Sequence, residues 1–285
     1  MDTNPPAIGV LHPGQMGISV AHALIEGGNR VCWASDGRSQ GTKDRAAKYA
    51  LHDSQSLEQL CNNCNVVFSI CPPAEALNLA RSVIANGFSG IYVDGNAIAP
   101  SSTREIASEL AKANINYVDG GIIGPPAWRA GTTRLYLSGT RASTVCALFD
   151  GSVMDTVNLG EGIDTASAMK MAYAAWTKGS AALLLNVFAL AKSHNLHPAL
   201  LEEWGLSQPG LESKLDNAAL GNAPKGWRFV GEMNQIATTL SDAGLHPGAF
   251  DAAASVYEAL APFKDAESQT ITTDAVIDAI VKARR

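Results

Sequence analysis

The feature that most constrains the fold of this chain is a continuous run of helix-forming residues from Thr165 to His194. The run contains no proline and a single glycine, and alanine, leucine, methionine and lysine dominate it, all of which are strong helix formers. Thr165 is a candidate N-cap, and Lys192 suits the C-terminal end. A helix of about 28 residues would be about 40 Å long. Because apolar residues cover most of its circumference, we expect it to be buried on several sides.

One cation in this run, Lys170, has no acid four residues away. Ala166 and Ala174 occupy the neighbouring turns, and Thr177 falls near the same face, so a molecule has room to approach the ammonium group. Taken alone, this pattern is more typical of a lysine whose stem covers apolar surface and whose ammonium group reaches water. A catalytic lysine is the alternative, and the rest of the chain has to decide between the two.

Length, composition and charge exclude several classes of protein. The 285 residues predict about two domains, and 46% hydrophobic residues are typical of a soluble globular protein. A net charge of −6 argues against a nucleic-acid or anionic-membrane partner. The start of the sequence lacks a basic leader, and no apolar run of about 18 residues is uninterrupted, so we expect a cytoplasmic protein. The five cysteines are scattered, and Cys61 and Cys64 lack the further ligands of a zinc site, so no metal is predicted.

Predicted strands and helices alternate through the first half of the chain. Strand patterns cover Ala7–Leu11, Arg30–Ala34, Val66–Cys71, Gly90–Asp94, Asn116–Val118, Arg134–Ser138 and Val157–Leu159. Helical patterns cover Ile18–Glu26, Thr42–Tyr49, Ser56–Cys61, Ala74–Asn86 and Ser101–Asn114. This alternation predicts a Rossmann-type α/β domain with a parallel, doubly wound sheet over residues 1–160. Residues 161–285 show only helical periods and predict an all-α domain opened by the long helix.

A glycine-containing turn follows the first predicted strand. Its sequence, HPGQMG, aligns with the G-x-G-x-x-G fingerprint of dinucleotide-binding folds, with His12 in place of the first glycine and Gly14 and Gly17 in the other two positions. Gly14 would let the backbone approach a pyrophosphate at the N-terminus of the following helix, and Gly17 would permit close packing of helix on strand. In this strand–turn–helix–strand context, the turn predicts a nucleotide cofactor.

The end of the second predicted strand contains both kinds of signal for the adenosine ribose. An acid at the strand tip favours NAD, whereas arginine and hydroxyl groups favour NADP. By count from the turn the tip is Ser35, with Asp36 one residue late, and Arg38, Ser39 and Lys43 follow. The pattern therefore favours NADP, bound with the help of Ser35, Arg38 and Ser39, and leaves NAD as the alternative.

Four stretches, in order along the chain, resemble a single family. They are VLHPGQMG at Val10–Gly17, DGNAIAP at Asp94–Pro100, DGGIIGPP at Asp119–Pro126, and the helix that contains Lys170. Together they resemble the β-hydroxyacid dehydrogenase superfamily, which includes 6-phosphogluconate dehydrogenase, 3-hydroxyisobutyrate dehydrogenase and imine reductases, in a branch with a DUF1932-type C-terminal domain. The resemblance covers most of the chain. It implies hydride transfer between a nicotinamide cofactor and a small hydroxyacid, alcohol or ketone.

The resemblance also implies roles for individual residues. Lys170 matches the family's catalytic lysine, a general acid/base that moves the hydroxyl proton while the nicotinamide moves the hydride. Asn96 stands where the family has a serine, and Tyr173 and Ala174 stand where it has paired asparagines. The cofactor-binding residues implied in this way are His12, Pro13, Gly14, Gln15, Met16, Cys71, Pro72 and Asn96. The substrate-binding residues are Asn96, Ile122, Ile123, Gly124, Tyr173, Ala174 and Thr177.

The departures from the family pattern predict a less polar substrate pocket than that of a simple hydroxyacid dehydrogenase. Large aromatic side chains would line it instead, although such residues are more often ordinary packing; the candidates are Trp128, Tyr173, Trp176 and Trp227. Glu232 and Asn234 stand near the family's later Lys-Asp pair. They would face the substrate or lie on a solvated helix face, and the sequence leaves both open.

Two other functions remain as alternatives. The imine reductase branch commonly has aspartate or tyrosine at the position of Lys170, which counts against that activity here. A nucleotide-binding sensor without turnover is disfavoured by the presence of Lys170, while His12 and Ile123 leave it open. In each case the ligand would be a small molecule. We also expect a homodimer, because a long apolar helix should find part of its burial in a second chain.

Overall fold

The computed structural model describes residues 7–267 and 270–283. It divides into two compact units, Met1–Met171 and Ala172–Arg285. The division falls inside the long helix α7 (Thr165–Ser193), whereas the sequence analysis placed the domain boundary at residue 160, before the helix. The helix is therefore shared: its first two turns belong to the N-terminal unit and the remainder to the C-terminal unit.

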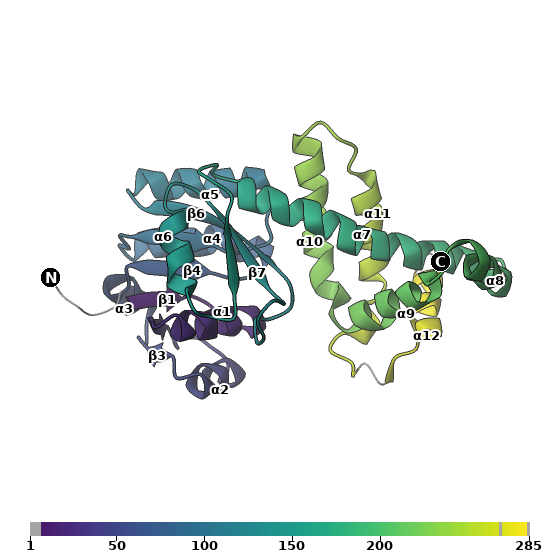
Figure 1. The fold of residues 1–285 in the computed structure, drawn as a ribbon, viewed down its shortest axis with the longest axis horizontal. Coiled ribbons are helices and arrows are strands. Elements are labelled where there is room, and N and C mark those ends of the chain that lie inside the picture. Colours follow the sequence, from purple (N-terminus) through teal and green to yellow (C-terminus); the bar gives the residue numbers. More distant parts are fainter. Residues whose placement is uncertain (1–6, 268–269, 284–285) are drawn as a thin grey trace. The chain divides into compact units, whose positions relative to one another are not determined.

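The N-terminal unit is built on one eight-stranded sheet of order β3-β2-β1-β4-β5-β6-β7-β8 (Figure 1). The strands are β1 (Ala7–Val10), β2 (Arg30–Trp33), β3 (His52–Asp53), β4 (Val66–Ser69), β5 (Ile91–Asp94), β6 (Asn116–Ile123), β7 (Arg134–Ser138) and β8 (Asp155–Asn158). All neighbours pair in parallel except β6 and β7. The predicted doubly wound α/β sheet is confirmed, with one antiparallel pair.

The antiparallel pair has a local cause. Parallel neighbours need a crossover, usually a helix, to return the chain to the starting edge. No helix lies between Ile123 and Arg134, so β7 runs straight back along β6. The sequence analysis anticipated β7 as a strand but not its direction. It also missed the two-residue strand β3 and the short helix α6 (Ala142–Cys146).

Helices cover both faces of this sheet (Figure 1). Besides α6 they are α1 (Gln15–Glu26), α2 (Gln40–Lys48), α3 (Leu57–Asn63), α4 (Ala76–Ala85) and α5 (Pro100–Lys112). One hydrophobic cluster joins the sheet to α1 and α6, and a second joins it to α3, α4 and α5. Each central strand supplies residues to both clusters by alternation, as expected of a sheet that is buried on both sides.

The C-terminal unit is entirely helical among the residues described. After α7 come α8 (His197–Ser207), α9 (Leu211–Asn222), α10 (Gly226–Asp242), α11 (Gly248–Glu258) and α12 (Thr273–Lys282). α10 packs against α11, and α9 packs against α8 and α12. The single glycine of α7, Gly179, allows a close approach, since a Cβ there would lie 2.7 Å from a ring carbon of Phe250 on α11. The predicted all-α region is confirmed.

The ends of α7 are defined by different means. Asp164 occupies the N-cap position, because its carbonyl accepts the hydrogen bond of Ala168 N–H, so Thr165 is the first helical residue rather than the predicted cap. At the other end Asn195 adopts φ 57°, and the N–H of Leu196 bonds the carbonyl of Ala191 at 2.8 Å. That is a Schellman-type stop with asparagine in the left-handed position.

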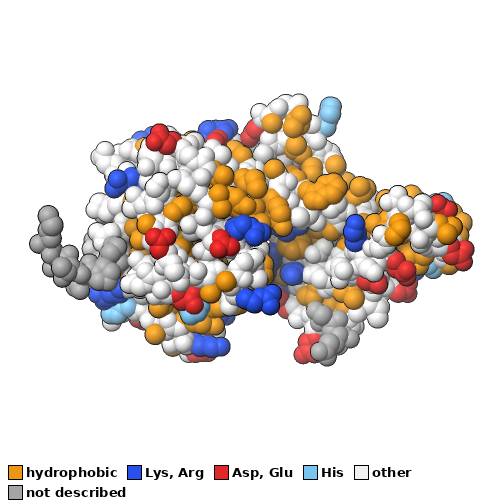
Figure 2. Space-filling model, in the orientation of Figure 1, with side chains coloured by type: hydrophobic (Ala, Val, Ile, Leu, Met, Phe, Trp, Pro, Cys, Tyr) orange, Lys and Arg blue, Asp and Glu red, His pale blue; other side chains and the backbone are white. Residues whose placement is uncertain are grey.

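Among the residues that the structure describes, α7 is not buried on several sides as predicted. Trp176 is 76% exposed, Leu183 64% and Leu190 60%. Figure 2 shows hydrophobic side chains in orange on the exposed surface along this helix. By length and composition, α7 could also cross a membrane. One such helix is only weak evidence of a membrane span, because core helices of soluble proteins meet the same criteria.

Candidate functional site

The turn between β1 and α1 has the backbone that a dinucleotide-binding loop requires. A Cβ on Gly17 would lie 2.0 Å from the carbonyl oxygen of His12, so only glycine fits where α1 meets the turn. A Cβ on Gly14 would meet nothing within 4 Å, and no side chain caps α1 at this residue. The open N-terminus of α1 therefore suits an anion, which backbone N–H groups and the helix dipole would bind.

His12, which replaces the first glycine of the fingerprint, is largely buried beside Arg38. Burial and, to a lesser degree, the Arg38 charge lower the pKa of His12 to about 4, so the imidazole is neutral at neutral pH. The guanidinium of Arg38 donates to the carbonyl of Leu11 at 3.3 Å. Within the described part of the chain, His12 Nδ1 and Arg38 Nε are buried without a hydrogen-bond partner. Two such donors or acceptors beside an open helix N-terminus fit a polar ligand.

A further cation next to the turn was missed by the sequence analysis. Arg45 on α2 donates from Nε to the carbonyl of Pro13 at 3.3 Å and from Nη2 to the hydroxyl of Thr42 at 3.0 Å. The hydroxyl groups of Thr42 and Ser39 lie 3.1 Å apart. The spacing of three between Thr42 and Arg45 puts both on one face of α2, a signal that was present in the sequence. The sequence alone did not predict that α2 packs against the turn.

The other predicted residues of this region lie on α1, just after β2 and on α2. Gln15 is the first residue of α1, and Met16 packs against the core cluster of that face. Ser35 and Lys43 line a small cavity of about 280 Å³ beside the end of β2. Asp36 is exposed, and its N–H bonds the carbonyl of Gln55 at 2.9 Å.

Asn96 ties together the carboxyl ends of β4 and β5. Its Oδ1 accepts from the N–H of Cys71 at 2.6 Å, and its Nδ2 donates to the hydroxyl of Ser69 at 2.9 Å. Its own N–H donates to Asp94 Oδ1 at 2.9 Å. Asn96 is only 2% exposed, so its side chain holds the loop that contains Cys71 and Pro72.

Lys170 is held at the carboxyl end of β6. Its Nζ donates to the carbonyl oxygen of Ile122 at 2.9 Å, and the residue is half-buried. The side chains of Ile122 and Ile123 are 6% and 2% exposed and face the core, so these residues contribute backbone rather than side chains. Gly124 has φ +130°, and a Cβ there would lie 2.4 Å from the carbonyl oxygen of Thr132, so glycine is required.

Three predicted substrate residues lie on the part of α7 within the C-terminal unit. Tyr173 is 43% exposed, and Ala174 is fully buried. The hydroxyl of Thr177 donates back to the carbonyl of Tyr173 at 3.1 Å. Glu232, for which the sequence left two positions open, does not lie on a solvated helix face. It is 8% exposed and pairs with Lys178 at 2.9 Å.

Two of the aromatic residues that were candidates to line the substrate pocket contact other side chains of the protein. Trp128 stacks on Tyr49 with ring centroids 5.0 Å apart, within the N-terminal unit. The ring of Trp227 faces the cations of Arg228 and Lys264 at 4.9 Å and 4.4 Å. Such contacts are typical of packing at a surface. Trp176 lies instead at the edge of a groove.

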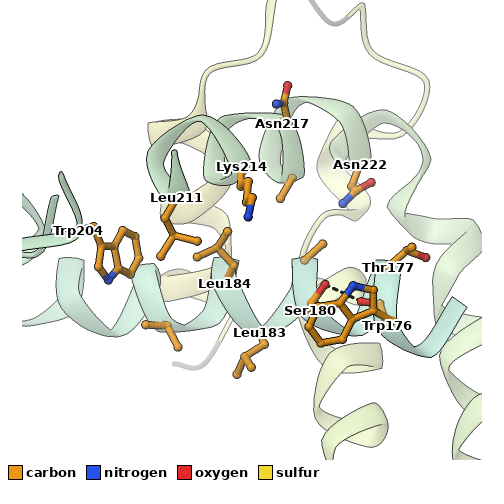
Figure 3. A pocket seen from close by; sticks show the side chains of 13 residues that line it. Trp176, Thr177, Ser180, Leu183, Leu184, Trp204, Leu211, Lys214, Asn217 and Asn222 are labelled. Atoms are coloured by element: carbon orange, nitrogen blue, oxygen red, sulfur yellow. Dashed lines mark hydrogen bonds between the residues drawn. The ribbon is translucent and has the colours of Figure 1, made fainter. Parts of the chain in front are cut away.

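That groove runs along α7 within the C-terminal unit and has a volume of about 710 Å³. Figure 3 shows leucine and tryptophan side chains from α7, α8 and α9 around it, with Lys214, Asn217 and Asn222 on one side. A second hollow of about 290 Å³ lies between α7 and α11 and is also mainly apolar. The exposed apolar stripe of α7, which includes Trp176, Leu183 and Leu190, therefore has a hollow on each side.

Comparison with known proteins identifies both regions of the chain. The NAD binding domain of 6-phosphogluconate dehydrogenase matches residues 7–147, and the domain of unknown function DUF1932 matches residues 191–260. An uncharacterized 28.5 kDa protein in the 7S RNA 5′ region of Methanothermus fervidus is 31% identical over 166 residues. That match spans 58% of this chain and 63% of the relative, which is less than two thirds of its length.

Solved structures share the fold over nearly the whole chain. The 3-hydroxyisobutyrate dehydrogenase of Mycobacterium tuberculosis, solved with L-serine, has a TM-score of 0.72 at 16% identity and covers 97% of this chain and 99% of that one. The imine reductase of Myxococcus stipitatus, solved with NADP+, has a TM-score of 0.57 at 18% identity, covering 89% and 93%. A variant of the same enzyme was solved with NAD+. Residues 7–147 therefore match the NAD binding domain of 6-phosphogluconate dehydrogenase, residues 191–260 match the DUF1932 domain, and the chain shares the fold of these solved structures.

Proposed function

We propose that this protein is an NAD(P)-dependent oxidoreductase that transfers a hydride between the nicotinamide and a small hydroxyacid, alcohol or ketone, with Lys170 as the general acid/base. One observation carries the proposal. The ammonium group of Lys170 is held on Ile122 O at the carboxyl end of β6, the same edge of the sheet at which β1 leads into the glycine turn. In doubly wound sheets ligands bind outside the carboxyl ends of the strands.

Different residues would bind the cofactor and transfer the proton. The cofactor supplies the hydride chemistry when bound. The turn at Gly14 and the N-terminus of α1 would hold its pyrophosphate. In oxidation Lys170, as a free amine, would take the proton of the substrate hydroxyl; in reduction its ammonium form would return a proton to the carbonyl oxygen. An ammonium group has three N–H donors, so Lys170 can keep its bond to Ile122 while a second N–H faces the substrate.

The finer proposals concern the cofactor, the assembly and the compartment. Arg38 with Ser35 and Ser39 supports NADP as the preferred cofactor, since a 2′-phosphate takes charge-assisted hydrogen bonds from arginine. The exposed apolar stripe of α7 supports a homodimer that buries Trp176 and Leu183. We place the protein in the cytoplasm, acting on a small molecule rather than on nucleic acid or a membrane.

The experiment is a screen for hydride transfer followed by the absorbance of the reduced nicotinamide. Hydroxyacids, aryl-substituted alcohols and cyclic imines would each be tested with NADP and NAD in the appropriate redox state. Turnover of a hydroxyacid or alcohol is the expected result. Turnover of imines alone would replace this activity with that of an imine reductase. Cofactor binding without turnover of any of the three substrate classes would indicate a nucleotide-binding sensor.

A further inference from the structure

The first turn of α7 is attached to the sheet by hydrogen bonds. The N–H of Ala166 donates to the hydroxyl of Ser138 on β7 at 3.0 Å. The N–H of Ser167 donates to Asp119 Oδ2 on β6 at 2.7 Å. The first N–H groups of a helix have no partner inside the helix. Here a carboxylate and a hydroxyl from two neighbouring strands satisfy two of them.

Asp119 is the centre of this attachment. It is 1% exposed, and its Oδ1 accepts a second hydrogen bond, from the hydroxyl of Ser167. That hydroxyl lies 2.8 Å from the hydroxyl of Thr103 on α5. Burial raises the pKa of Asp119 to about 6, and the two bonds from Ser167 oppose the rise. A negative charge at a helix N-terminus interacts favourably with the helix dipole, and burial reduces screening by salt.

Two glycines next to Asp119 bring the backbones together. A Cβ on Gly121 would lie 2.7 Å from the carbonyl oxygen of Ala166 and 3.1 Å from the Cβ of Lys170. A Cβ on Gly120 would lie 2.8 Å from the carbonyl oxygen of Asp94 on β5. The start of α7 therefore lies directly on the backbone of β6, and the distance between them is set at Gly121, two residues after Asp119.

The next hydrogen bond between these two elements is that of Lys170. Asp119 bonds Ser167, and three residues further along both elements Ile122 bonds Lys170. These two attachments, with the close approach at Gly121 between them, define the register of α7 on β6. All these residues lie within the N-terminal unit.

We propose that Asp119 is a positioning residue for Lys170: its two bonds to Ser167 hold the first turn of α7 in the register that places the Lys170 ammonium group on Ile122 O. This inference rests on the proposed function for its catalytic consequence, but the placement of Lys170 can be measured without a substrate. Asp119 is buried and acts through Ser167 and α7.

The first test measures the reactivity of Lys170 towards acetic anhydride. The whole protein is labelled, and acetylation at each lysine is then read by mass spectrometry of its peptides. Asp119→Asn keeps the size of the side chain and removes its charge. Loss of the register should expose the Lys170 amine and raise its labelling rate by about fivefold, the scale of one ordinary hydrogen bond. Lys178, paired with Glu232 in the other unit, is an internal reference whose rate should not change. An unchanged Lys170 rate in Asp119→Asn overturns the proposal.

Asp164→Asn is the matched control. Asp164 is a carboxylate at the same helix N-terminus, but its side chain pairs with Arg104 at the surface and does not bond α7 to β6. Its loss should leave the labelling rate of Lys170 within about twofold of the parent, because an exposed charge near a helix end contributes little. If Asp164→Asn raises the rate as much as Asp119→Asn does, the effect is one of charge and the proposal fails.

The second test separates positioning from stability by kinetics, once a substrate is known from the screen. Asp119→Asn should lower kcat by about tenfold to a hundredfold, the cost of a misplaced catalytic group, with little change in cofactor affinity. In a Lys170→Ala background the same substitution should have no further effect, because it acts through Lys170. Independent, multiplying effects would refute a positioning role. Normal turnover in Lys170→Ala alone would instead refute the proposed function, whatever the labelling result.

Discussion

The ammonium nitrogen of Lys170 lies 2.9 Å from the carbonyl oxygen of Ile122. The bond joins a side chain of α7 to the backbone of β6, so the lysine is oriented by the sheet and not only by its own helix. Its aliphatic stem has a glycine opposite it, since Gly121 presents no Cβ to Lys170. This arrangement differs from that of a lysine whose ammonium group simply extends into water.

Replacing Lys170 with alanine should abolish most of the turnover and little else. Ala166 and Ala174 already occupy the adjacent turns, so an alanine at position 170 suits this face of the helix, and we expect the fold and cofactor affinity to persist. Turnover should fall by about a hundredfold or more. Steady-state kinetics with a cofactor titration on the purified variant would check this. Lys170→Arg should not restore activity, because a guanidinium does not give up its proton at working pH; an active arginine variant would argue against proton transfer.

The two arginines near the turn should affect cofactor binding differently. Arg38→Ala should weaken NADPH binding by about tenfold or more, the scale of a hydrogen bond to a charged group, and change NADH binding little. Arg45→Ala removes the bond to the carbonyl of Pro13 beside the turn and should weaken both cofactors alike. Fluorescence titration with each reduced cofactor measures the four affinities. Equal losses for NADPH and NADH in Arg38→Ala would show that Arg38 does not discriminate between them.

The apolar stripe of α7 should be covered by a second copy of the chain. Light scattering at micromolar concentration should show a dimer, and Leu183→Asp should shift it towards monomer because a charge would be buried in the interface. Leu245→Asp is the control, since Leu245 is similarly exposed at 58% but lies outside α7. A monomeric parent protein, or a dimer equally disturbed by both changes, would contradict this assembly.

Asp94 should make the protein less stable as pH rises. Burial raises the pKa of its carboxyl to about 7, and its Oδ2 has no hydrogen-bond partner among the residues described. Between about pH 4 and pH 7 the unfolded chain has lost this proton while the folded chain retains it, so unfolding becomes more favourable as the pH increases. Above pH 7 both states are ionised, and the full cost of the buried charge remains. The acidic side of this window is the stable one.

Thermal or denaturant unfolding of the parent protein and of Asp94→Asn tests this effect. Asparagine keeps the acceptor for Asn96 N–H and does not titrate. Raising the pH from about 5 to about 8 should cost the parent about 2–4 kcal/mol more than it costs the variant, from a shift of about three pKa units. Asp119 titrates in the same direction in both proteins. A parallel pH dependence of the two would show that Asp94 is not the group responsible.

Residues that are close together in the sequence determine a large part of this structure. The length of α7 followed from a run of helix formers without proline, and the requirement for glycine at position 17 followed from the spacing of the turn. The alternation of strands and helices identified the α/β unit. These features depend on residues that are close in sequence, so their energies can be assessed from the sequence alone.

Contacts between segments that are distant in the sequence depend on the tertiary structure. The direction of β7, the reach of Arg45 to the turn and the internal use of the Asn96 amide each depend on which elements become neighbours. The same holds for Asp119: its neighbours in the sequence do not predict its hydrogen bonds with Ser167, which lies 48 residues away. A buried carboxylate takes its ionisation and its role from the donors that surround it. Those donors, Ser138 and Ser167, come from β7 and α7, and only the packing of these elements brings them together.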